Sequence, residues 1–284
     1  MASRRSPATV VGAVITVFLA VGWFAFERHL LQVSNRQRAH EAISSAQKVV
    51  ESHREQLRAK LRQHAEHVAN QNWFQSSIFT DDATIQDALI DNVTYNPSDA
   101  RIFLVLNSAF AVRAQLPEKG LHSDSDVRAS LRQEDGSFPA PLVIGTKVYE
   151  IAGLSTAPDK RTRKPSYVVA GQAIDPYDLS ELTNSLIAIV AGNKTFLGSQ
   201  DSALQEALSL TAWGPSTTEK SVTVGTKTFL ALAQDVGRKT APIWFVSLVA
   251  VDDERWLFKL LLFVPVLASI GLACVAVWRY RSLK

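Results

Sequence analysis

Histidines in the first third of the chain are the residues best placed to do chemistry together. His64 and His67 are three residues apart, so on a helix both would share one face and, with a third ligand, could hold a metal ion. With His53 they could also titrate together and sense acid. An exposed helix surface explains the same spacing without either property. We adopt that interpretation and expect no metal site.

Sequence patterns typical of hydrolases and phosphate-binding enzymes do not occur in this chain. There is no Gly-x-Ser-x-Gly turn and no Gly-rich phosphate loop. The single cysteine, Cys274, lies in an apolar segment, so the polar part of the chain has neither a disulfide nor a thiolate ligand. The acidic pair Asp81-Asp82 lacks the spacing of a calcium loop. We therefore expect no enzyme activity and no cofactor.

Side chains that combine an apolar body with a polar tip are the candidates for lining a ligand pocket. They are Arg101, Tyr149 and Tyr167, each in or beside an expected strand, and a concave sheet face is a favourable place for a pocket. The same residues could equally serve as core or edge positions. The densest positive run, residues 160–164, could receive an anionic ligand or an acidic partner surface, or it could be a solvated loop.

Two apolar segments bracket this polar part. Residues 8–26 carry no charge and, at about 1.5 Å per residue, are long enough to cross a hydrocarbon core of roughly 30 Å. A cleaved signal peptide is the competing interpretation, but this run exceeds a usual signal-peptide core and has no small-residue cleavage site before Glu27. Residues 255–278 carry Trp256 and Trp278 near the two expected membrane interfaces. We predict two transmembrane helices.

Charge placement predicts the orientation of these helices. All 27 acidic residues lie between residues 27 and 254, whereas the short tails, residues 1–7 and 279–284, carry only basic charges. By the positive-inside rule both tails are cytoplasmic, and the part between the spans lies in the periplasm of a bacterium, anchored in its inner membrane. The net charge of +3 is therefore a topology signal. Because the basic residues are not pooled on one soluble face, we expect no nucleic-acid partner.

A long helix is predicted to follow the first span. Residues 27–72 contain neither Gly nor Pro, and a helix of that length extends about 70 Å. An apolar stripe recurs along it in steps of three, four and seven, at Ala39, Ile43, Ala46, Val50, Leu57, Leu61 and Val68. This stripe can pack against a globular module or against a second copy of the chain. It motivates the hypothesis of a homodimer through the long helix.

The remaining polar part repeats one order of elements: a helix, a strand pair, a helix and further antiparallel strands. The first set comprises a short connection and a helix over 73–92, a further helix at 125–133, and strands at 102–106, 111–116, 147–153 and 167–173. The second comprises helices at 175–185 and 202–211, and strands at 186–191, 195–198, 222–224, 228–233 and 243–251. We predict an α+β fold with two PAS-like antiparallel-sheet modules. The membrane-distal module is residues 93–175 and the membrane-proximal module is residues 176–254, both carried by a long helix and connection over residues 27–92.

With these segments in place, the chain resembles the double Cache sensory domains of bacterial receptors, closest to the type found in sensor kinases and cyclases. The resemblance depends on the long helix from Glu27, the strand pair over 102–116, and the segment 168–175, VVAGQAID, which is similar to a Val-x-Gly-x-x-Ile-Asp-like segment of that family. The first hairpin departs from the family, since residues 107–110, NSAF, occupy a turn usually made by Asp and Gly. The family's amino-acid-binding signature is not matched, so amino-acid sensing is not implied.

The resemblance implies a sensor that binds a small ligand or partner and passes a conformational change through the second span. The output is absent from this chain and would come from a signalling partner protein or from a continuation beyond Lys284. The alternative is a non-catalytic scaffold that holds a cell-envelope complex together. A polar-lined pocket would favour the sensor, and an exposed apolar patch would favour the scaffold.

Overall fold

The computed structural model describes residues 7–94, 101–117, 141–156, 158, 165–214, 218–237 and 242–251. The chain divides into two compact units, one of Met1–Glu41, Gly225–Thr228 and Ala250–Lys284, the other of Ala42–Val224 and Phe229–Val249. Both sheets have most of their residues in the second unit, together with the helix from residue 42 onward. The contacts described below lie within that unit.

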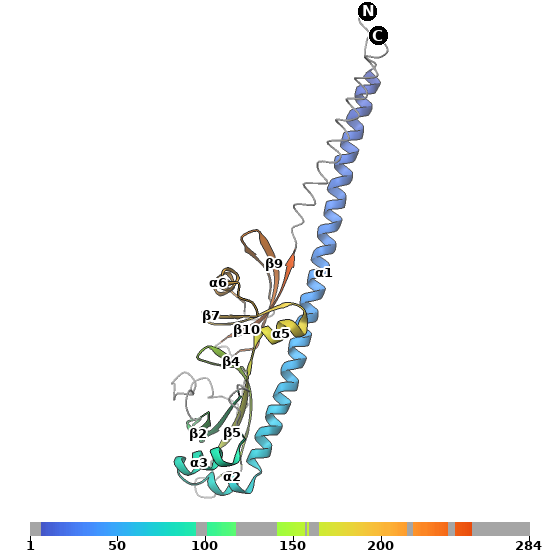
Figure 1. The fold of residues 1–284 in the computed structure, drawn as a ribbon. Coiled ribbons are helices and arrows are strands. Elements are labelled where there is room, and N and C mark those ends of the chain that lie inside the picture. The colour runs from blue at the N-terminus through green and yellow to red at the C-terminus, as the bar shows by residue number, and fades with distance from the viewer. Residues whose placement is uncertain are drawn as a thin grey trace, which may run out of the picture. The chain divides into compact units, whose positions relative to one another are not determined.

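Helix α1 (Pro7–Ala69) runs without a break through the first expected span and the long helix. Most of the predicted apolar stripe is buried, Leu57 only partly, and the side chains of Ile43, Val50 and Leu61 are at most 6% exposed. Val50 packs into a cluster that contains residues of both sheets, and Leu61 packs against the first sheet. Figure 1 shows this half of α1 running alongside both sheets. The stripe therefore packs against the chain's own modules.

Two short helices follow where the sequence predicts a connection and one helix. Helix α2 (Asn72–Ser77) is short, and α3 (Asp82–Asn92) begins directly after its N-cap residue, Asp81. The carboxylate of Asp81 accepts a 3.0 Å hydrogen bond from the amide of Thr84, which satisfies a donor that the first turn leaves unpaired. Both helices pack with α1 on one face of the first sheet.

The first sheet has the strand order β2-β1-β5-β4-β3. Its strands are β1 (Arg101–Leu106), β2 (Val112–Leu116), β3 (Leu142–Ile144), β4 (Lys147–Ser155) and β5 (Tyr167–Ile174). The predicted hairpin of β1 and β2 is confirmed, and the side-chain oxygen of Asn107 accepts from the amides of Ala109 and Ala111 in its turn. Strand β3 was not predicted, because Pro139 and Pro141 indicate a turn there.

The second sheet has the order β7-β6-β10-β9-β8, which is the same topology. Its elements are α5 (Pro176–Thr183), β6 (Leu186–Ala191), β7 (Lys194–Leu197), α6 (Ser202–Leu210), β8 (Thr218–Val224), β9 (Lys227–Asp235) and β10 (Ile243–Val251). In both sheets the last strand lies between the first hairpin and the remaining two strands. The predicted α+β class and the two antiparallel sheets are therefore confirmed, whereas the predicted repeat is tested only in part, because its helix at 125–133 lies outside the described residues.

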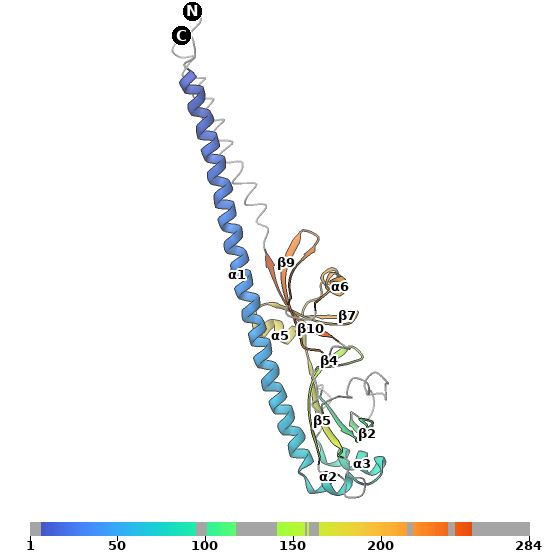
Figure 2. The same cartoon turned by 180° about the vertical axis from the view of Figure 1, so that it is seen from behind.

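Hydrophobic clusters cover both faces of the first sheet and join it to the second. One face packs on α1, α2 and α3, through residues such as Phe103 and Val105, and the other is built around Leu104 and Val169. The joining cluster combines Val148 and Ile174 of the first sheet with strands β6 and β10, α5 and α1. Figure 2 shows α5 beside α1, as in Figure 1.

Among the residues that the structure describes, we find no helix that is long and apolar enough to cross a membrane. The second expected span, residues 255–278, and the expected helix at 125–133 lie outside the described residues, as do most side chains of residues 8–26. The basic residues 160–164 also lie outside them.

Candidate functional site

A row of polar side chains crosses the face of the first sheet that α1 covers. Strand pairing sets Arg101 opposite Gln172, and Gln172 opposite Glu150, across β1, β5 and β4. Because side chains alternate between the two faces of a sheet, paired residues lie on the same face. Glu150 lies on the face where Ala152 contacts the α1-side cluster, two residues further along its strand.

Glu150 is at the centre of a buried ion cluster, the Arg54–Arg58–Glu150 cluster. The carboxylate has no exposed surface, and Arg54 is 3% exposed. Arg54 Nε donates to Glu150 Oε2 at 2.8 Å and its Nη2 donates to Oε1 at 3.4 Å, while Arg58 Nε also donates to Oε1. Taking these charges out of water costs several kcal/mol per ion, so the cluster is stable only with its partners in place. It therefore holds α1 at one position against β4.

Arg54 also links the two sheets. Its guanidinium carbon lies 4.5 Å from the centroid of the Phe245 ring, which belongs to β10 of the second sheet. A cation over an aromatic face within about 6 Å is attracted by the ring. One α1 side chain thus contacts a carboxylate of the first sheet and a ring of the second. A shift of α1 at this point would disturb contacts in both sheets.

Further along α1, a cavity of about 180 Å³ lies between this helix and the ends of β1 and β5. Polar and apolar side chains share its lining: Leu57, Lys60, Leu61, His64, Val93, Thr94, Arg101, Ile102, Phe103, Ala170, Gly171 and Gln172. The polar group comprises an ammonium, a guanidinium, an imidazole, an amide and a hydroxyl. None of these described lining residues is acidic.

The pKa of His64 is lowered in this region. Its ring packs edge-on against Phe103, with ring centroids 6.0 Å apart. This partial burial lowers the pKa of His64 below its ordinary value of 6.5, and the nearby charges of Arg101 and His67 lower it further. The imidazole is therefore mainly neutral at pH 7, when it can donate one hydrogen bond and accept another.

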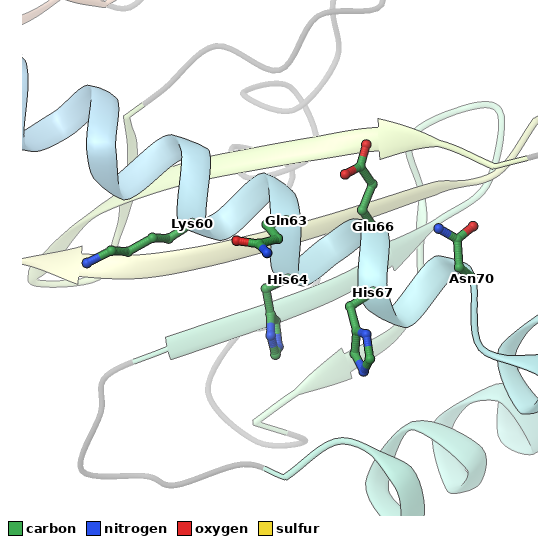
Figure 3. A pocket seen from close by; sticks show the side chains of 6 residues that line it. All are labelled: Lys60, Gln63, His64, Glu66, His67 and Asn70. Carbon is green, nitrogen blue, oxygen red and sulfur yellow. The ribbon is translucent and has the colours of Figure 1, made fainter.

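His64 and His67 project to the same side of α1, as their spacing predicts, whereas Glu66 points away (Figure 3). They line a shallow surface depression with Lys60, Gln63 and Asn70. The ring nitrogen Nε2 of His67 lies 3.1 Å from the side-chain nitrogen of Gln71. Among the described residues, no group of three or more histidine, cysteine or acidic side chains could hold a metal ion.

The three predicted pocket residues are not brought together. Arg101 lines the cavity on the α1 side, whereas Tyr149 and Tyr167 pack with the cluster on the opposite face. The tyrosines are also far from each other, because Tyr167 pairs with Ser155, six positions along β4 from Tyr149, or about 20 Å. Tyr167 stacks on Phe110 with ring centroids 4.7 Å apart.

The sequence interpretation missed the Arg54–Arg58–Glu150 cluster, although the sequence around Arg54 and around Glu150 indicates that both face inward. Arg54 follows Val50 by four residues and precedes Leu57 by three, so it falls within the apolar stripe. Glu150 lies between apolar residues in a strand, at a position whose alternate neighbours, Val148 and Ala152, face inward. A charge on each of two inward-facing surfaces is a reason to expect that they pair.

No protein-family model matches this chain, and no curated protein matches its sequence. Among solved structures, the periplasmic domain of Vibrio cholerae LuxQ is 10% identical with a TM-score of 0.44, over 74% of this chain and 97% of that domain. The ligand-binding domain of the Pseudomonas fluorescens chemoreceptor CtaA, in complex with L-isoleucine, is 14% identical with a TM-score of 0.44, over 83% and 99%. That of the Pseudomonas aeruginosa amino acid chemoreceptor PctB, in complex with L-Arg, is 14% identical with a TM-score of 0.38, over 81% and 92%.

Two of these three neighbours are ligand-binding domains of chemoreceptors, and the third is the periplasmic domain of LuxQ. At such identities and TM-scores they carry no argument about the ligand or the site residues of this chain. The case for a function comes from the chain's own contacts.

Proposed function

We propose that this chain is a membrane-anchored periplasmic sensor that binds a small ligand and passes a conformational change through its second span to an output outside this chain. The observation that carries the proposal is the dual role of α1. This helix lines the cavity through Lys60 and His64, and about two to three turns earlier Arg54 contacts both sheets. Ligand binding that favours one position of α1 would therefore favour one arrangement of the two modules.

The anchoring and topology in this proposal come from the sequence. The apolar segments 8–26 and 255–278 and the basic tails support a two-pass inner-membrane protein with both ends in the cytoplasm. Homodimerisation through the long helix stays a prediction. Because the stripe from Ile43 to Val68 packs against the chain's own modules, a dimer contact would have to use another side of α1.

The test uses the full chain in lipid nanodiscs, with Cys274 replaced by Ser and spin labels at Asp87→Cys in α3 and Glu206→Cys in α6. Both positions are exposed, and they report on the first and second modules respectively. We expect a ligand that raises the melting temperature also to change the distance distribution between the labels. Small anions, amino acids and neutral alcohols form the ligand panel.

A stabilising ligand that leaves this distance distribution unchanged would contradict transmission between the modules. If no ligand of the panel stabilises the protein and a membrane protein co-purifies with it, the scaffold interpretation replaces the sensor.

A further inference from the structure

Helix α1 carries a second apolar stripe, distinct from the one that packs against the sheets. It lies in the first half of the helix, and its steps alternate between four and three residues: Leu19, Trp23, Phe26, Leu30 and Val33. This is the heptad spacing with which a helix faces its partner in a coiled coil. All of these side chains are between 49% and 69% exposed in the single chain. We call this set the exposed heptad stripe.

The exposed heptad stripe does not compete with the packing of α1 against the chain's own modules. At about 100° per residue, its centre lies about 160° around the helix from Ala39, the first residue of the buried stripe. Ala39 is 5% exposed, whereas Leu30 and Val33 are about half exposed. The two stripes therefore lie on nearly opposite sides of α1. The exposed stripe can contact another surface while the buried one stays in place.

Lipid accounts for only part of the exposed heptad stripe. Its first three residues fall within the first expected span, where exposed apolar side chains are normal. Leu30 and Val33 follow the polar residues 27–29, and at about 1.5 Å per residue Val33 lies roughly 10 Å beyond the end of that span. Exposed leucine and valine side chains that continue the stripe outside the hydrocarbon core indicate a contact with protein.

A second copy of the same helix suits this stripe. Because both copies are anchored with the same end in the cytoplasm, their α1 helices run parallel, and each stripe residue meets its own counterpart at the same height. The stripe contains no charged residue, so equal residues can face each other without repulsion.

The residues that flank the stripe also suit a parallel pair. In a parallel coiled coil, a flanking residue faces the one five positions later in the other helix. Arg36 would then face Glu41 of the second copy, and both side chains are exposed in the single chain. The flanking residue one heptad earlier is His29, which would face an uncharged serine. The flanking charges therefore attract across the interface and bring no like charges together.

We propose that α1 forms a parallel two-stranded coiled coil with a second copy of this chain through the exposed heptad stripe. The proposal rests on the two-pass topology of the proposed sensor, which sets the helices parallel, and it names the partner surface of that sensor. It uses another side of α1 than the predicted dimer, whose stripe is mostly buried within the chain. Because α1 also contacts both sheets through Arg54, a shift of α1 in one copy would reach the other.

Disulfide cross-linking of the full chain, in membranes of the cells that express it, tests the interface. Single cysteines replace Leu30, Val33 or Leu31 in the Cys274→Ser background, and copper phenanthroline is the oxidant. We expect much more covalent dimer for Leu30→Cys and Val33→Cys than for Leu31→Cys, because only facing positions bring two Cβ atoms within disulfide reach. Leu31 is the matched control, since it is a neighbouring leucine, 40% exposed, outside the stripe.

Resonance energy transfer between full chains in lipid vesicles measures the association itself. The labels are placed at Glu206→Cys, an exposed position of α6, again with Cys274→Ser. Leu30→Glu should weaken association by roughly a hundredfold or more, because two carboxylates would face each other in an apolar contact. Leu31→Glu adds the same charge at nearly the same height and should change association little, which controls for effects on membrane insertion.

A charge exchange tests the parallel register. Arg36→Glu should weaken association, because it sets two carboxylates opposite each other, and adding Glu41→Arg should restore it. Both residues are exposed in the single chain, and far-UV circular dichroism checks that each variant is folded.

Equal cross-linking of Leu30→Cys and Leu31→Cys, or energy transfer that Leu30→Glu leaves unchanged, would overturn the coiled coil. A monomeric protein would overturn it too, and would leave lipid or residues 255–278 of the same chain to cover the stripe. If the chain is monomeric and a ligand still changes the distance between the spin labels, this inference fails and the sensor function stands. If the stripe forms a dimer and no ligand changes that distance, the inference stands and the sensor function fails.

Discussion

Replacing Glu150 by Gln removes the negative charge at the centre of the Arg54–Arg58–Glu150 cluster. Arg54 then remains 3% exposed without a counter-charge, and leaving one member of a buried pair unpaired costs about 3–5 kcal/mol. That is a large part of the 5–15 kcal/mol that usually stabilises a folded protein. For a soluble part of this size the melting temperature should fall by roughly 6–20 °C. Urea unfolding of the full chain in detergent, followed by tryptophan fluorescence and circular dichroism, measures the loss.

The double variant Arg54→Met with Glu150→Leu separates the buried charge from simple loss of contact. Both charges disappear together, and Arg58 can turn to solvent because 43% of its side chain is already exposed. We expect the double variant to be more stable than either single variant, since apolar replacement of a buried pair is often neutral. Arg58→Ala is the control, with a smaller expected loss than Glu150→Gln, because 43% of the Arg58 side chain is exposed and Glu150 keeps Arg54 as a partner. Additive losses in the double variant would refute this reasoning.

Three further predictions concern packing, capping and pH. Gly198→Ala should lower the free energy of unfolding in urea by about 1–3 kcal/mol, because the added Cβ would lie 2.6 Å from the carbonyl oxygen of Pro176. Gly192→Asn is the control and should cost less than about 1 kcal/mol, because the space there is open and Asn tolerates its φ of +60°. Asp201→Ala should cost about 1 kcal/mol by the same measurement, since its side chain caps α6, and an unchanged midpoint would show that the cap contributes nothing. Because the pKa of His64 is lowered on folding, the unfolded chain binds a proton more readily than the folded one, and stability falls as the pH drops below 6.5. The melting temperature of His64→Gln should fall less than that of the natural protein in this pH range. Identical curves would contradict the lowered pKa of His64.

Local patterns in the sequence predicted most elements of the described fold. Strand β1 reads as a continuous apolar run because its residues face buried clusters on both sides of the sheet. Asp81, Asp175 and Asp201 each cap the helix that follows, and a cap depends only on neighbouring backbone amides. Such features involve residues close in the chain, so they can be found without knowledge of the tertiary structure. Strand β3 was missed because its proline-flanked segment becomes a strand only by pairing with β4.

The candidate site was only partly predicted. Arg101 was selected with Tyr149 and Tyr167 because all three have an apolar body and a polar tip, a property that does not indicate the face of the sheet. Strand register places Arg101 opposite Gln172 and on the α1 side, away from the tyrosines. His64 was considered with His67 for metal binding, whereas the fold brings it against Phe103 and into the cavity with Arg101.

By itself, the sequence determined the α+β class, the repeated order of elements and the apolar stripe of the long helix, since these depend on periodicity, turns and caps. Only the tertiary structure decided that Arg54 meets Glu150, 96 residues away, and that Lys60 and Arg101 line one cavity. The physical reason is that the position of a helix on a sheet determines which charged side chains meet in the interior. That position depends on many packing contacts between residues far apart in the chain, so it cannot be derived from a local sequence pattern.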